Sequence, residues 1–146
     1  MTCGFAAVLA CCASCTTPTD RARAASTEAV RARAQHGLQL LRDENGSRAS
    51  LEAAVEKISE ENPDSTVDLG RTVPASGGFV ADFAFTAYTE AGGGGDYVQV
   101  AVRLCVSYSG EVSLSNSAAV VDRICPPGLP GSVRGVPVVG DVKLSD

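Results

Sequence analysis

The chain has 146 residues, a formal net charge of −5 and a hydrophobic share of 45%. That length corresponds to one domain, and the roughly 125 residues that follow an N-terminal leader can bury about two thirds of their unfolded surface, so we expect a core that needs no metal or other cofactor. Tryptophan is absent, aromatic residues make up 5%, and acidic residues outnumber basic ones mainly after residue 62. These features argue against nucleic acid as a partner, because phosphate binding needs clustered Lys and Arg and base stacking needs aromatic platforms.

Residues 1–15 have the composition of an export leader. They contain no charged side chain, and the apolar stretch FAAVLA is followed directly by Cys11. This stretch is far shorter than the about 20 apolar residues of a transmembrane helix, and it resembles the end of a secretory signal. The order Val8-Leu9-Ala10-Cys11 resembles the bacterial lipobox, and the excess of Arg over Lys resembles proteins of high-GC bacteria. The resemblance implies that the thiol of Cys11 takes a lipid group and that Cys11 becomes the mature N-terminus.

The neighbouring cysteines leave alternatives open. Cys12 or Cys15 could be the lipidated residue, and the true start site is open because no charged segment precedes the apolar run. Cys12-Ala13-Ser14-Cys15 also has the C-x-x-C spacing of redox dithiols and of half a zinc site, but no strand precedes it and no second C-x-x-C follows. We therefore interpret the segment as a targeting signal rather than as a redox or metal site. It predicts an extracytoplasmic protein that a lipid anchor holds to the cell membrane, or a secreted protein if the leader is simply removed.

The next part of the chain has a helical pattern. Residues 16–22 are expected to form a linker, and residues 23–62 two helices, because apolar residues recur at helical spacing on both sides of a glycine-containing break. Ser47 or Ser50 can cap the second helix. Asn62-Pro63 ends that helix, since proline disfavours the helical conformation in the residue before it.

This helical segment also carries much of the positive charge and the single histidine. We interpret Arg21, Arg23, Arg31 and Arg33 as a solvated helix face rather than as a contact with anionic lipid. His36 is expected to be a surface or packing residue, because no Ser, Cys or carboxylate stands at a spacing that indicates catalysis.

From residue 65 to about residue 122 the apolar period changes from helical to two. Residues 79–88 and 97–108 each alternate an apolar face with a mixed face, and the glycine-rich segment between them is expected to be a hairpin loop. The pattern predicts an α+β fold in which the N-terminal helices pack on one face of an antiparallel β-meander of three to five strands. Residues 23–146 then form a single domain, in which the Pro/Gly-rich tail of residues 126–146 adds one edge strand.

Two cysteines remain outside the leader, and we expect them to form a disulfide. Cys105 and Cys125 belong to an apparently exported chain, in which a disulfide is the ordinary state of such a pair. Alternation places Cys105 on the mixed face of its strand. The segment that leads to Pro126-Pro127 must therefore cross the outer face or the edge of the sheet and not its helix side.

The sequence indicates binding more than catalysis. It contains no H-E-x-x-H, no G-x-S-x-G, no phosphate loop and no dinucleotide fingerprint. Helices followed by a meander resemble two families by element order, the cystatin-like fold and the ketosteroid-isomerase-like cone. The inhibitory motif of the cystatins is matched here only at Gln99, so protease inhibition does not carry over. We expect a non-catalytic binding or scaffolding domain for an unknown envelope protein or small ligand. The alternative is a small cone-type enzyme in which Asp82 and a tyrosine transfer a proton.

Overall fold

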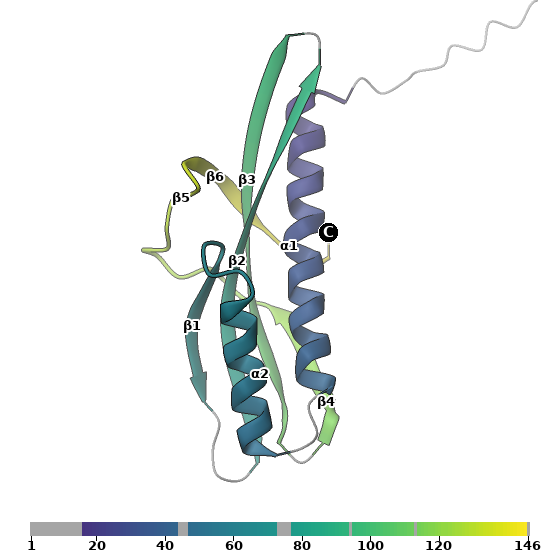
Figure 1. The fold of residues 1–146 in the computed structure, drawn as a ribbon, viewed down its shortest axis with the longest axis vertical. Helices are drawn as coiled ribbons and strands as arrows, with labels where there is room; N and C mark the ends of the chain where they lie inside the picture. Colours follow the sequence, from purple (N-terminus) through teal and green to yellow (C-terminus); the bar gives the residue numbers. More distant parts are fainter. Residues whose placement is uncertain (1–15, 44–46, 73–76, 94, 113, 146) are drawn as a thin grey trace, which may run out of the picture.

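The computed structural model describes residues 16–43, 47–72, 77–93, 95–112 and 114–145. Its elements, in chain order, are α1 (Pro18–Asp43), α2 (Arg48–Glu60), β1 (Thr66–Thr72), β2 (Gly78–Gly93), β3 (Asp96–Glu111), β4 (Leu114–Asp122), β5 (Ser132–Val133) and β6 (Val136–Val142). Both helices lie on one side of the sheet, and the long helix α1 runs beside the β2–β3 hairpin (Figure 1). The predicted α+β fold with helices on one face of the sheet is confirmed.

Helix α1 begins earlier than the predicted linker of residues 16–22 allows. Its first residue is Pro18, because proline has no N–H to satisfy and a φ that suits the first helical position. Thr17 caps the helix: its Oγ1 accepts a hydrogen bond from the Asp20 N–H at 3.1 Å, and the Asp20 carboxylate accepts one from the Thr17 N–H at 3.2 Å. The boundary between α1 and α2 and the end of α2 were predicted correctly, and Ser47 is the N-cap of α2.

The sheet has six strands in the order β1-β2-β3-β6-β5, with β4 also paired to β3. The meander from β1 to β4 is antiparallel, but β6 pairs parallel to β3, which a pure meander does not include. The reason is the length of β3. Its pairing with β4 covers residues 106–111, and this leaves residues 101–104 on the same edge free to pair with β6.

The core lies between α1 and the hairpin. Small residues on α1 allow the helix to approach the sheet closely, and the buried Ser26 donates a hydrogen bond from Oγ to the Val100 carbonyl at 2.8 Å. The hydroxyl of the buried Tyr108 donates to the Ala34 carbonyl at 2.8 Å. The helix-facing residues of β2 and β3 form the other wall, chiefly Phe79, Ala81, Phe83, Phe85, Val100, Val102, Leu104, Val106 and Tyr108.

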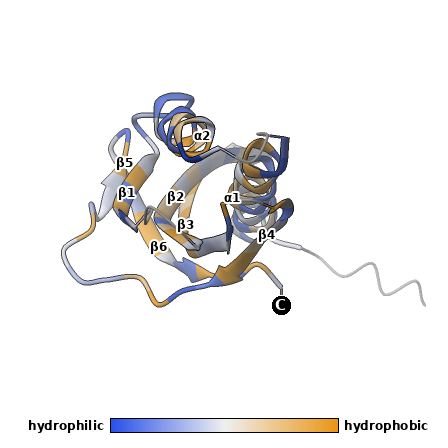
Figure 2. Ribbon diagram, turned by 90° about the horizontal axis from the view of Figure 1, so that it is seen from below, coloured by the Kyte–Doolittle hydropathy of each residue, from blue (hydrophilic) through white to orange (hydrophobic). Residues whose placement is uncertain are grey.

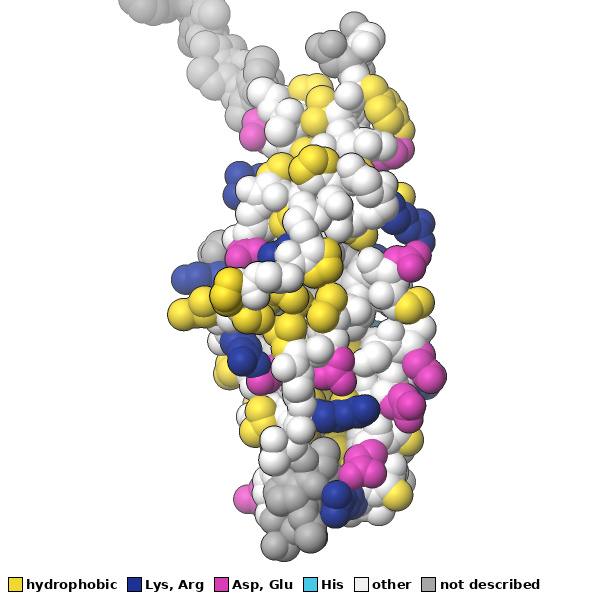
Figure 3. Space-filling model, turned by 90° about the vertical axis from the view of Figure 1, so that its left-hand side faces the viewer, with side chains coloured by type: hydrophobic (Ala, Val, Ile, Leu, Met, Phe, Trp, Pro, Cys, Tyr) yellow, Lys and Arg dark blue, Asp and Glu magenta, His cyan; other side chains and the backbone are white. Residues whose placement is uncertain are grey.

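The outer face of the sheet is covered by the C-terminal segment, which loops around the side opposite the helices (Figure 2). The predicted disulfide between Cys105 and Cys125 is present, with a Cα–Cα distance of 5.3 Å. Further along the same segment, Arg103 donates a hydrogen bond to the Pro130 carbonyl, and Val133 packs on the buried Ala101. The prediction that this segment crosses the outer face or the edge of the sheet, and not its helix side, is therefore correct. Hydrophobic side chains gather on the side where β1, β5 and β6 lie (Figure 3).

Candidate functional site

Two adjoining cavities lie where α1, the end of α2 and the edge of β2 meet. The first has a volume of about 250 Å³ and is mainly apolar, with walls that include Gly37, Leu40, Ile58 and Phe85. The second has a volume of about 200 Å³ and is mainly polar, with Asp64, Ser65, Thr86, Tyr88 and Arg134 in its wall. Both cavities are lined by Arg33, Glu61 and Asn62. Each is smaller than the roughly 300–1,000 Å³ of a typical ligand site, but together they fall into that range.

The polar cavity forms because β1 is shorter than its neighbour. Strand β1 begins at Thr66, which pairs with Phe85. Beyond that point no described strand pairs with this edge of β2. The loop after α2 takes the place of a strand: the Thr86 N–H donates to the Ser65 carbonyl at 2.7 Å, and the Ser65 N–H donates to the Asn62 carbonyl at 3.0 Å. The loop thus holds Asn62 and Ser65 against β2 at a point that α1 can reach from the helix side.

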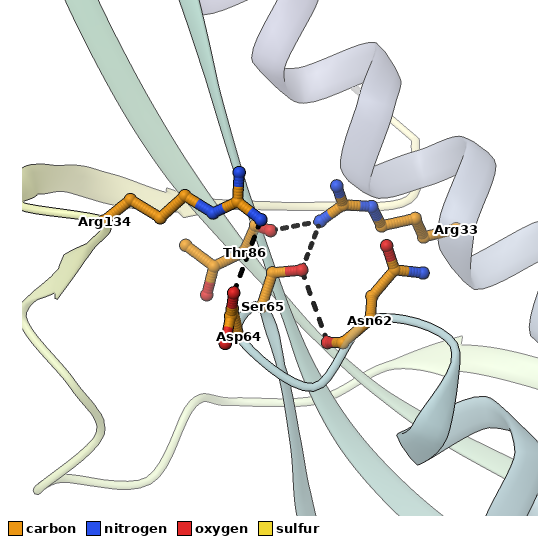
Figure 4. A network of polar contacts seen from close by, with 6 residues as sticks. All are labelled: Arg33, Asn62, Asp64, Ser65, Thr86 and Arg134. Atoms are coloured by element: carbon orange, nitrogen blue, oxygen red, sulfur yellow. Dashed lines mark hydrogen bonds and ion pairs between the residues drawn. The ribbon is translucent and has the colours of Figure 1, made fainter.

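Arg33 is positioned by the buried face of α1. It lies three and four residues from Val30 and Gly37, which are both buried, and so it flanks the side of the helix that packs on the sheet. Its Nη1 donates to the Ser65 Oγ at 3.0 Å and to the Thr86 carbonyl (Figure 4). Burial, and then the neighbouring Arg134, lower the pKa of Arg33, although a guanidinium remains protonated. Among the described residues, no carboxylate forms an ion pair with Arg33.

Arg134 reaches the same place from the outer side of the sheet. It occupies the two-residue turn between β5 and β6 together with Gly135, and both have positive φ, 48° and 81°. This geometry is that of a hairpin turn in which Asn-Gly is preferred, so Arg at the first position is unusual. Its guanidinium lies 3.3 Å from the Asp64 carboxylate. The Tyr88 hydroxyl, followed by Asp64, raises the pKa of Arg134. The guanidinium groups of Arg134 and Arg33 converge from opposite sides (Figure 4).

The rim of the apolar cavity carries a contact between an imidazole and a carboxylate. His36 Nε2 lies 2.9 Å from the Glu61 carboxylate, and both side chains are partly exposed. The carboxylate nearest to the shared wall of the two cavities is therefore already engaged by His36. This leaves the Arg33 guanidinium as the charged group that faces both cavities without an acidic partner in the described chain.

The structure separates the residues of the predicted proton-transfer pair. Asp82 lies on the outer face of β2, where it pairs with Arg123, and it lines neither of the two cavities. Tyr88 is on the same face but six residues along the strand, about 20 Å away at the usual rise. Tyr108 points to the opposite face and into the core. Tyr97 pairs with Gly92 near the other end of β2. No tyrosine in the described chain is thus placed beside Asp82, and the geometry offers no proton-transfer pair there.

Two predicted sites remain, the lipidated cysteine and the disulfide. Cys11, and with it the alternatives Cys12 and Cys15, lies outside the described residues. The Cys105–Cys125 disulfide is formed.

Within the described ranges, no helix is long and apolar enough to cross a membrane, and no group of three or more His, Cys, Asp or Glu side chains is arranged to hold a metal ion.

Sequence reasoning missed the arginine pair. Arg33 was interpreted as part of a solvated helix face, although its position next to the buried stripe of α1 indicates partial burial. Arg134 carries a weak local signal, since Arg-Gly stands between two valines where a two-residue hairpin turn fits. Nothing in the local sequence indicates that the two arginines meet.

Comparisons of the chain with protein-family models, with curated proteins and with solved structures gave no match.

Proposed function

We propose that this protein is an exported cell-envelope protein, anchored by a lipid at Cys11, whose α+β domain binds a ligand without transforming it. The observation that carries the proposal is the Cys105–Cys125 disulfide, which ties the C-terminal segment to the centre of the sheet. Disulfides of this structural kind persist in oxidising compartments outside the cytosol. The disulfide and the lipobox-like Val8-Leu9-Ala10-Cys11 are independent features, and both favour export.

A lipid at Cys11 would be compatible with the position of the first helix. Helix α1 starts at Pro18, so only a few residues separate the helix from the lipidated cysteine. The N-terminal end of α1 lies beside the tip of the β2–β3 hairpin, at one end of the elongated molecule (Figure 1). An anchor there would keep this end nearest to the membrane and leave both cavities, which lie further along α1, open to the surroundings.

The arrangement of charged groups favours binding over catalysis. At the two cavities each described carboxylate already has a side-chain partner, Glu61 in His36 and Asp64 in Arg134. A general base needs a free carboxylate or imidazole that points at a substrate. A half-buried arginine beside an apolar cavity is instead typical of a site that recognises a charged group and holds it.

Metabolic labelling with a fatty-acid probe tests the anchor. The full chain is expressed in a bacterial host with a lipoprotein pathway, and wild type is compared with Cys11→Ala, with Cys12→Ala and Cys15→Ala as matched controls. We expect label in wild type and in both controls and none in Cys11→Ala. Equal labelling of wild type and Cys11→Ala, or no label in any of them, would refute the anchor at Cys11.

A further inference from the structure

The two cavities share one wall, and that wall carries a cation. Arg33 separates an apolar space between α1 and α2 from a polar space at the edge of β2. A molecule that occupied both spaces would need an apolar part on one side of Arg33 and an anionic group on the other. The juxtaposition therefore specifies the chemistry of a ligand more narrowly than either cavity does alone.

The pairing of the charged groups around the polar cavity favours an anionic group in that ligand. Arg33 and Arg134 both line this cavity, Asp64 pairs with Arg134, and Glu61 contacts His36 at the rim of the other cavity. Arg33 has no carboxylate partner among the described residues, so an anionic group of the ligand can take that place. The Arg134–Asp64 pair is exposed, with 63% and 69% of the two side chains accessible. Such surface pairs are weak, so Arg134 is free to share its guanidinium with an incoming anion.

Hydrogen-bond donors are available in the same place. Arg33 uses Nη1 for Ser65 and Thr86, and its Nη2 donates no hydrogen bond to another described residue. A guanidinium presents a planar fork of N–H groups that matches the two oxygens of a carboxylate. The Asn62 side chain lies in the wall between the two cavities and lies beside Arg33 in Figure 4.

We propose that this site binds an amphipathic carboxylate, in which the carboxylate lies between Arg33 and Arg134 and a short apolar chain fills the cavity formed by Gly37, Leu40, Ile58 and Phe85. A medium-chain fatty acid has this chemistry. The assignment deepens the proposed function, on which it rests for the view that the domain binds rather than catalyses. It does not depend on lipidation of Cys11.

The test is calorimetric titration of the purified, oxidised full chain with four probes. Octanoate carries both the charge and the chain, octanol only the chain, acetate only the charge, and inorganic phosphate a larger charge without a chain. We expect octanoate to bind at least about tenfold more tightly than each of the other three. Octanol binding as tightly as octanoate would overturn the role of the arginines. Phosphate binding more tightly than octanoate, or no binding of octanoate, would overturn the assignment as well.

Substitutions then locate the site. Arg134→Asn removes the guanidinium and introduces a residue that tolerates the left-handed turn, so the fold is retained. We expect octanoate affinity to fall about tenfold or more in Arg134→Asn and in Arg33→Gln, since each loses a charge-assisted hydrogen bond. Arg48→Gln, at an exposed pair with Glu52 on α2, is the matched control and keeps wild-type affinity. Unchanged affinity in Arg134→Asn with an unchanged urea midpoint would refute the site. Absence of fatty-acid label from wild type, or equal label in wild type and Cys11→Ala, with octanoate binding intact would refute the anchor alone.

Discussion

Gly37 on α1 faces the Tyr108 side chain of β3, and adding one methyl group there tests how the helix packs on the sheet. A Cβ on Gly37 would lie 2.6 Å from the Tyr108 hydroxyl oxygen and 3.1 Å from its Cζ. The Tyr108 ring is completely buried, packs edge-on against Phe83 and is tied to the Ala34 carbonyl, so it has little room to withdraw. Overpacking of this kind costs about 1–3 kcal/mol, and loss of the hydroxyl's hydrogen bond about 1 kcal/mol more.

The intrinsic helix propensity works in the opposite direction. Alanine is favoured over glycine in a helix interior by about 1 kcal/mol, so Gly37→Ala would stabilise α1 if the position were open. With the contact to Tyr108 included, we expect a net loss of about 2 kcal/mol in the free energy of unfolding. That is a large part of the roughly 5–15 kcal/mol that stabilises a typical domain.

A double-mutant cycle in urea denaturation isolates the contact. Tyr108→Phe removes the oxygen and is expected to cost about 1 kcal/mol by itself. In that background Gly37→Ala should be nearly neutral, because the ring Cζ at 3.1 Å needs to move only slightly. A Gly37→Ala protein that is as stable as wild type, or one whose loss is the same with and without the Tyr108 hydroxyl, would refute this account of how α1 packs.

Three further predictions concern stability. Replacing Cys105 and Cys125 together with alanine is expected to lower the free energy of unfolding by roughly 3 kcal/mol, because the cross-link spans 20 residues of sequence; urea titration should then show that reductant brings wild type down to the variant. Burial raises the pKa of Tyr108 above its value in the unfolded chain, so the folded state favours the protonated hydroxyl. The stability that this protonated hydroxyl contributes is complete below about pH 10 and is lost as the pH rises further. Ultraviolet titration should show one of the three tyrosines ionising only with unfolding, and ionisation of all three in the folded protein would contradict the prediction. Ser47→Ala removes the oxygen that accepts from the Ser50 N–H at 3.1 Å and should cost about 1 kcal/mol, visible as a lower urea midpoint.

Local patterns in the sequence were sufficient to predict which segments are helices and strands, and which residues of the long strands face the helices. Alternation in β2 and β3 predicted which residues face the helices, because side chains on a strand alternate and this part of the sheet is buried on the helix side. The same alternation placed Cys105 on the outer face and so predicted the path of the C-terminal segment. The start of α1 was missed because threonine and proline were interpreted as a linker, although Thr17 and Asp20 carry the pattern of a capping box.

The arrangement of the site was decided by tertiary structure. Strand β6 joins the sheet in parallel because β4 leaves part of the β3 edge unpaired, and this depends on strand lengths that no local pattern reports. The β5–β6 turn then carries Arg134 to the open edge of β2, where the loop after α2 has brought Ser65 within reach of Arg33. Composition alone determined that the chain is acidic and poor in aromatic residues. Only the packing of distant segments placed two cations at one cavity, because that contact depends on the register and curvature of the whole sheet rather than on neighbouring residues.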